Sequence, residues 1–407
     1  MGYAFSSDQD FNFDVQTLLG GVAYGAGDVG EILATLNGVE AGDTRGWATA
    51  FAALAARVAA IADQARAAGD TRSAADAYLR AATYFGAQMG AELTYADDAG
   101  LLATFRAHRR CWDAFADLND PALQRVSIPY PGSDMPGYFL SVDGAERPTL
   151  IVINGSDGPL TWVWTLAKAA QAYGYNALLF DGPGQQSMLF EHGIGFRPDW
   201  EHVIAPVVDL LLERSDVDAQ RLVLWGGSQG GFWCPRALAF EPRLAAGVAD
   251  PGVVDVAASW FQHLPPELIS LLDAGDRADF DAAMQQWLSD PDAKATWTFR
   301  ARPYGTFDPY EVFTAMRQYN LAEVAAQIKV PILICSPEGE QFWPGQAARL
   351  AELVDGPAEL VPFTAAEGAD MHCEPMARTL AYQRMFDWLA KVLPSPDAGR
   401  RRGNHGE

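Results

Sequence analysis

The stretch of residues 222–231 constrains the fold of this chain more than any other part of it. It begins with the apolar run Leu-Val-Leu-Trp, typical of a buried strand, and continues into Gly-Gly-Ser-Gln-Gly-Gly at the start of a helical stretch. A strand, a sharp turn and a helix around G-x-S-x-G form a nucleophile elbow, because the glycines permit a strained turn. The stretch therefore predicts that Ser228 is a nucleophile at the carboxyl end of a central strand.

A glycine-rich helix start can also be a phosphate cradle or a plain tight turn. Here no Lys followed by Ser or Thr completes a P-loop. Lys and Arg number 29 against 52 Asp and Glu, and the resulting net charge of −23 repels phosphate groups and anionic lipid surfaces. The nucleophile is the favoured interpretation, and nucleic acid and membrane are not expected as partners.

Short apolar runs alternate with helical stretches through much of the 407-residue chain. Runs that are apolar throughout are typical of strands buried on both faces of a parallel sheet. The sequence therefore predicts an α/β fold with a doubly wound, mostly parallel sheet. The expected strands are 137–142, 149–153, 177–180, 222–225, 246–249, 332–335 and 359–363, and the expected covering helices are 199–214, 229–240 and 375–392.

Two regions interrupt this alternation. Residues 46–118 are Ala-rich with apolar positions at helical spacing, and the segment Ala67-Ala68-Gly69-Asp70 predicts the turn of a helical hairpin. Residues between Ala249 and Val330 have helical patterning and no clear strand. The predicted units are a helical N-terminal domain (1–122), the first part of the core (123–250), an inserted helical cap (251–328), the second part of the core (329–393) and a disordered tail (394–407).

A serine nucleophile needs an oriented histidine as its base. Along chains with this elbow the order is serine, acid, histidine. His192 and His202 precede Ser228, and the remaining candidates lie in the N-terminal helices, the cap or the tail. His372, in a loop between the last expected strand and the last helix, is the predicted base.

The acid that orients the histidine should follow a late strand. Glu338 and Glu340 both stand just past the strand that ends near Cys335. Glu340 fits better, because it lies a few residues before a proline and leaves room for one helix and one strand before His372. Glu338 remains the rival, and Asp250, at the end of an earlier strand, is a distant third.

The oxyanion of a tetrahedral intermediate needs two N–H donors. The backbone N–H of Gln229 is the first, and the loop that follows the strand 149–153 supplies Ser156 as the expected second. The segment 181–185, Asp-Gly-Pro-Gly-Gln, is interpreted as a structural turn at the floor of the pocket. No metal-binding or nucleotide-binding motif is present, so no cofactor or metal is expected.

Other features bear on substrate and compartment. The predicted cap is rich in aromatic residues, which favours an apolar or aromatic small-molecule substrate. Four cysteines lie far apart without C-x-x-C spacing, so a reducing, cytoplasmic location is expected. The N-terminus does not resemble a signal peptide, and no apolar run approaches the ~18 residues of a membrane span. The aromatic cap residues are Trp260, Phe261, Phe280, Trp287, Trp297, Phe299, Tyr304, Tyr310, Phe313 and Tyr319.

Taken together, these pieces resemble the α/β-hydrolases related to 2,6-dihydroxypseudooxynicotine hydrolase and the fungal polyketide-shortening (heptaketide) hydrolases of pigment biosynthesis. The resemblance covers roughly residues 11–393. The segments that carry it are residues 77–82 (Ala-Tyr-Leu-Arg-Ala-Ala), 154–158 (Asn-Gly-Ser-Asp-Gly), 180–185 (Phe-Asp-Gly-Pro-Gly-Gln), 197–201 (Arg-Pro-Asp-Trp-Glu), 249–252 (Ala-Asp-Pro-Gly), the Ser228 elbow and the His372 loop.

The resemblance implies a Ser/acid/His hydrolase whose site is covered by the N-terminal helices and the cap, often in a homodimer. It also implies cleavage of a carbon–carbon bond beside a ketone, as in a β-diketone, through an acyl-enzyme. This chain departs from the family pattern by carrying Glu where Asp is usual. Alternatives are an esterase or peptidase-like hydrolase, a cyclase or acyl transferase that uses the same serine, and a non-catalytic binding protein.

Overall fold

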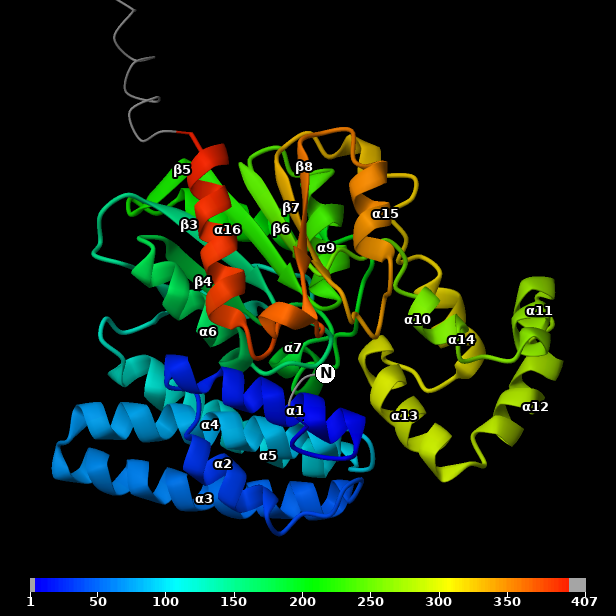
Figure 1. The fold of residues 1–407 in the computed structure, drawn as a ribbon, viewed down its shortest axis with the longest axis horizontal. Coiled ribbons are helices and arrows are strands. Elements are labelled where there is room, and N and C mark those ends of the chain that lie inside the picture. The colour runs from blue at the N-terminus through cyan, green and yellow to red at the C-terminus, as the bar shows by residue number, and fades with distance from the viewer. Residues whose placement is uncertain (1–3, 395–407) are drawn as a thin grey trace, which may run out of the picture.

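A sheet of eight strands lies at the centre of the computed structural model, which describes residues 4–394 (Figure 1). The strands are β1 (Gln124–Ile128), β2 (Met135–Leu140), β3 (Arg147–Ile153), β4 (Asn176–Phe180), β5 (Val217–Gly227), β6 (Ala246–Asp250), β7 (Ile332–Pro337) and β8 (Ala358–Phe363). Their order is β1-β2-β4-β3-β5-β6-β7-β8. Only β2 pairs in antiparallel fashion, with β1 and β4; the other pairs are parallel. The mostly parallel α/β sheet predicted from the sequence is confirmed.

The sheet is covered on both faces because its central strands are apolar on both sides. In β3, Leu150 and Val152 join the core cluster on one face, and Ile151 and Ile153 join the cluster on the other. Helices α6 (Leu160–Ala172) and α16 (Arg378–Val392) pack on the first face. Helices α8 (Glu201–Leu212), α9 (Gly230–Leu238) and α15 (Gln346–Leu353) pack on the second.

Five helices precede the sheet in the chain and lie beside the carboxyl ends of its parallel strands (Figure 1). Helices α3 and α4 form the expected hairpin: Gly69 ends α3 with a φ of +83°, and α4 begins at Thr71. Asp43 and Asp97 cap α3 and α5 by accepting hydrogen bonds from backbone N–H groups. The five are α1 (Gln9–Gly20), α2 (Val29–Leu36), α3 (Thr44–Ala68), α4 (Thr71–Glu92) and α5 (Asp98–Leu118), with η1 (Val22–Tyr24) between the first two.

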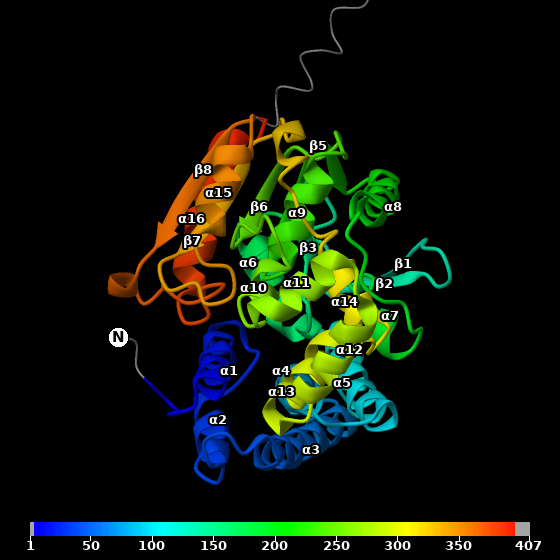
Figure 2. The same cartoon turned by 90° about the vertical axis from the view of Figure 1, so that its right-hand side faces the viewer.

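A helical insertion separates β6 from β7 and stands next to the N-terminal helices (Figure 2). It contains α10 (Ala258–Phe261), α11 (Pro266–Ala274), α12 (Arg277–Trp287), α13 (Pro291–Ala301), η2 (Arg302–Tyr304), α14 (Pro309–Met316) and η3 (Ala325–Gln327). Phe280, Trp297 and Phe313 form its own core. Phe299 packs instead against the N-terminal helices, and Tyr319 lies in the core of the sheet.

Several elements differ from expectation. Strand β1 and helices α1 and α2 were not expected as separate elements, because β1 is a short, largely exposed edge strand and the two helices lack a long periodic pattern. Strand β5 begins five residues before the apolar run, through a polar, partly exposed start. Of the tail predicted at 394–407, residues 395–407 lie outside the described residues. Within residues 4–394, no helix has the length and apolarity needed to cross a bilayer.

Candidate active site

Ser228 stands in the turn between β5 and α9, at the carboxyl end of a central strand. Its backbone φ is +56°, in the left-handed region that residues other than glycine rarely adopt. The turn is held by the Ser228 N–H, which donates to the backbone carbonyl of Asp250 at 2.7 Å. The side chain of Ser228 is only half-buried, so its hydroxyl can meet a ligand.

The glycines around Ser228 are required by close backbone packing. A Cβ atom at Gly231 would lie 1.8 Å from the carbonyl oxygen of Pro251, and one at Gly226 would lie 2.1 Å from that of Gly230. The first helical turn of α9 is therefore pressed against the end of β6. This packing fixes the direction in which Ser228 leaves the strand.

His372 lies in the loop before α16 and pairs with Glu340, which follows β7. Nδ1 of His372 is 2.8 Å from Oε2 and 3.0 Å from Oε1 of Glu340. The side chains are 5% and 6% exposed. Because the carboxylate accepts from Nδ1, the proton of a neutral imidazole is held there. Nε2 makes no hydrogen bond within the described chain and is the nitrogen available to a reactant.

Glu340 is kept as a carboxylate despite its burial. Burial raises its pKa, but the charge of His372 and hydrogen bonds from His372, Phe342 and Trp343 outweigh that effect, so the pKa lies below the ordinary value. The backbone N–H groups of Phe342 and Trp343 donate to Oε1 at 2.9 and 3.1 Å. Glu338, the rival candidate, is exposed and accepts from the Ala365 N–H at 3.0 Å instead.

Cys373 joins the histidine loop to the serine turn. Its thiol donates to the carbonyl of Asp250 at 3.1 Å and accepts from the Ser228 N–H at 3.2 Å. Burial raises the pKa of this thiol well above the ordinary value, so it stays protonated and can donate. Since Cys373 follows His372 directly, these bonds hold the histidine loop next to the elbow. Sequence reasoning assigned no role to this cysteine.

Asp250, the third candidate acid, faces Glu374 rather than the ring nitrogens of His372. Both carboxyls are buried, and within the described residues neither oxygen of Glu374 has a donor from any other group. Burial raises the pKa of each carboxyl, and the charge of Asp250 raises the pKa of Glu374 further. Two adjacent buried carboxyls do not both ionise readily, so the pair holds a proton between them.

The loop that follows β3 lies against the serine. A Cβ atom at Gly155 would be 2.8 Å from the Cβ of Ser228. The Gly155 N–H donates to its neighbour Asn154, whereas the N–H groups of Ser156 and Gln229 have no acceptor within the described residues. The contact at Gly155 brings the start of this loop against Ser228, and Gln229 follows Ser228 directly in the chain. The segment 181–185 supports the loop, because Gln185 Nε2 donates to the carbonyls of Asn154 and Gly155 at 2.8 Å.

Helix α1 lies against the histidine. The resemblance implied cover from the N-terminal helices, but no sequence pattern singled out this helix. The ring of Phe13 lies 6.2 Å from the ring of His372 and 6.3 Å from that of Phe342. The next residue is Asp14, and burial together with the charges of Asp157, Asp10 and Asp8 raises its pKa to about 8. A sequence signal exists only in residues 10–14, Asp-Phe-Asn-Phe-Asp, where polar residues and phenylalanines alternate.

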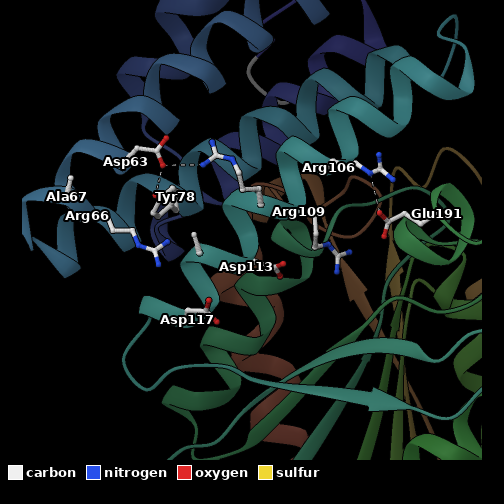
Figure 3. A pocket seen from close by; sticks show the side chains of 11 residues that line it. Asp63, Arg66, Ala67, Tyr78, Arg106, Arg109, Asp113, Asp117 and Glu191 are labelled. Atoms are coloured by element: carbon white, nitrogen blue, oxygen red, sulfur yellow. Dashed lines mark hydrogen bonds and ion pairs between the residues drawn. The ribbon is translucent and has the colours of Figure 1, made fainter.

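A separate pocket of about 770 Å³ opens among α3, α4 and α5 (Figure 3). Its charged side chains neutralise one another: Asp63 pairs with Arg110, and Arg106 pairs with Glu191. No predicted site residue lines it, and it contains no activated nucleophile. Within the described chain no group of three His, Cys, Asp or Glu side chains is arranged to hold a metal ion.

Comparison with known proteins identifies relatives over almost the whole chain. Hydrolase LUC6 of Fusarium sp is 30% identical over 94% of this chain and 96% of its own length. The 20-hydroxy-prefusarin hydrolase FUS2 of Gibberella moniliformis is 28% identical over 96% of this chain and 97% of its own. The predicted resemblance to fungal hydrolases is confirmed.

The fold has a solved counterpart in 2,6-dihydroxy-pseudo-oxynicotine hydrolase. The two structures superpose with a TM-score of 0.73 over 92% of this chain and 95% of the other, at 20% identity. AbyA5 superposes with a TM-score of 0.62 over 95% of this chain and 99% of its own, at 18% identity. Residues 150–390 also match the family model described as the alpha/beta hydrolase family. The chain belongs to the alpha/beta hydrolase family.

Proposed function

We propose that this protein is a serine hydrolase that cleaves an acyl group from an apolar small molecule through an acyl-enzyme on Ser228. One observation carries the proposal: a half-buried serine at a φ of +56° stands beside a loop whose histidine is paired, in the interior, with a carboxylate. A strained serine turn and a buried His–Glu pair each cost free energy, and both serve nucleophilic attack.

The first half of the reaction acylates the serine. Oγ of Ser228 forms a bond to the substrate carbonyl carbon while its proton passes to Nε2 of His372. Glu340 stabilises the imidazolium that forms. The carbonyl oxygen becomes an oxyanion and accepts from the free N–H groups of Gln229 and Ser156. Collapse of this intermediate breaks the bond to the leaving group, which takes the proton from His372.

The second half releases the product. A water molecule gives its proton to Nε2 of His372 and attacks the acyl carbon. The second tetrahedral intermediate then expels Oγ of Ser228, which recovers the proton. The products are a carboxylic acid and the protonated leaving group, and the enzyme returns to its starting state.

For the bond that is cleaved, we favour a carbon–carbon bond beside a ketone. The rings of Phe13 and Phe342 beside the imidazole suit a flat, apolar substrate, and a relative of similar length is named a 20-hydroxy-prefusarin hydrolase. A carbon leaving group departs as a carbanion, so the substrate must delocalise that charge. A β-diketone does so, because its leaving group is an enolate.

Covalent labelling tests the proposal directly. A fluorophosphonate probe should label the wild-type protein at Ser228, and Ser228→Ala should remove both the label and ester turnover while the circular dichroism spectrum is unchanged. Ser270→Ala, which changes an exposed serine of α11, is the matched control and should behave as wild type. Labelling or turnover that persists in folded Ser228→Ala would overturn the proposal.

A further inference from the structure

Arg300, near the end of α13, has a positive charge without a partner. It is half-buried, yet its guanidinium makes no ion pair or hydrogen bond within the described residues. Each of the other described arginines that is not exposed contacts a carboxylate, except Arg378, which bonds Thr165 and the carbonyl of Thr17. A half-buried guanidinium without a counter-ion has lost part of its hydration and is free to pair with an anionic ligand.

The position of Arg300 relates it to the candidate active site. Its Cζ atom lies 4.7 Å from the ring centre of Phe299 and 5.7 Å from that of Phe342. The Phe342 ring lies 4.7 Å from the ring of His372. Arg300 is therefore separated from the imidazole by a single aromatic ring, at a distance that a substrate of modest length can span.

The backbone next to Arg300 is anchored to the N-terminal helices at Arg302. Arg302 pairs with Asp98 and donates to the carbonyl of Ala96 at 3.0 Å, which ties the end of α13 to the start of α5. The rings of Phe299 and Phe342 beside it limit the motion of the guanidinium itself. The free cation is thus held between the cap, the N-terminal helices and the loop after β7.

The guanidinium of Arg300 offers a positive charge and several N–H donors in a fixed plane. A carboxylate or another oxyanion satisfies both the charge and the donors.

We propose that Arg300 is a specificity-determining residue that binds a carboxylate or enolate oxygen on an otherwise apolar substrate. This inference rests on the proposed function of Ser228. The net charge of −23 gives the protein a field that disfavours anions, so a fixed cation at the site selects a substrate whose acidic group lies at a set distance from the attacked carbonyl. Neutral analogues lose that contact.

Paired esters of equal carbon number test the inference. The acidic probes are the mono-4-nitrophenyl esters of adipic and suberic acid, and the neutral ones are 4-nitrophenyl hexanoate and octanoate. Arg300→Gln should lower the acidic-to-neutral ratio of kcat/KM about ten-fold or more at the better chain length, mainly through KM. Arg300→Lys should retain part of the ratio. Arg57→Gln, which changes an exposed arginine of α3, is the control and should keep it.

A second measurement separates this inference from the proposed function. In a Ser228→Ala background, calorimetry measures binding of the same four esters with and without the further change Arg300→Gln, and needs no turnover. Loss of preferential binding of the acidic esters in Arg300→Gln supports the inference even if Ser228 proves unreactive. Equal affinity for acidic and neutral esters at both lengths, or equal losses for both in Arg300→Gln, would overturn it even if the probe labels Ser228.

Discussion

Nδ1 of His372 lies 2.8 Å from Oε2 of Glu340, and water reaches almost none of either side chain. The N–H groups of Phe342 and Trp343 hold the other carboxylate oxygen, so the carboxylate cannot turn away from the imidazole. Screening by salt and solvent is weak for such a buried pair. Glu340 is therefore expected to orient the imidazole. Glu338, only two positions earlier in the chain, is exposed and is not expected to do so.

Glu340→Gln should lower kcat by roughly 10²- to 10⁴-fold with little change in fold, because an amide can hold the wrong imidazole tautomer and no longer stabilises the imidazolium. Turnover of a 4-nitrophenyl ester measures this. Glu338→Gln changes an exposed side chain and is the matched control, expected within about two-fold of wild type. If Glu338→Gln were the crippling change, the assignment of Glu340 would be wrong.

Asp14→Asn should remove a loss of stability that occurs in the wild type as the pH rises from about 4 to about 8. The pKa of Asp14 is raised to about 8, so in the wild type its contribution to stability falls as the pH rises from about 4, its unfolded pKa, through 8. The neutral amide does not titrate. The melting temperature of the variant minus that of wild type should therefore grow from pH 6 to 8 and then level off.

The control for that experiment is Asp387→Asn, which removes an exposed carboxylate of α16 far along the chain. It accounts for the general effect of losing one negative charge. A difference in melting temperature that is the same at every pH for Asp14→Asn would contradict the burial of a neutral carboxyl on α1.

Gly231→Ala should destabilise the protein and abolish turnover. The new Cβ would lie 1.8 Å from the carbonyl oxygen of Pro251, so α9 or the end of β6 must move, at a cost of about 1–3 kcal/mol or more. Gly90→Ala is the opposite case: nothing lies within 4 Å of its Cβ position in α4. It should stabilise by about 0.5–1 kcal/mol. Urea unfolding of both variants measures the contrast.

The bond that is cleaved can be found by comparing leaving groups. If the carbon–carbon reaction is correct, an aryl β-diketone should be hydrolysed and the matching simple ketone should be inert. Only the diketone releases a leaving group whose carbanion is delocalised. Values of kcat/KM for the diketone and for a 4-nitrophenyl ester decide the question. Fast ester turnover without detectable diketone cleavage would favour the esterase interpretation instead.

Local patterns were enough for much of the fold. Strands such as β3 and β7 are apolar runs between turns, and the Ser228 elbow is a glycine pattern whose meaning lies within a few residues of chain. The ends of β5 and the existence of β1 were missed, because polar residues at a sheet edge carry no hydrophobic pattern. The α/β-hydrolase fold was therefore predictable, and its edges were not.

The arrangement of the candidate site depended on contacts between distant parts of the chain. Sequence alone determined that Ser228 ends a strand and that His372 follows the last one, because strand, turn and helix propensities are local. It left Glu338 and Glu340 as rivals, since both follow β7 and only the turn of the backbone decides which carboxylate faces the imidazole. Only the tertiary structure decided that Phe13 lies beside His372 and that Arg300 lies beside Phe342. Both contacts form where α1, the cap and the loops at the end of the sheet pack together. The free energy of that packing depends on several distant segments at once, so no single segment of the sequence predicts it.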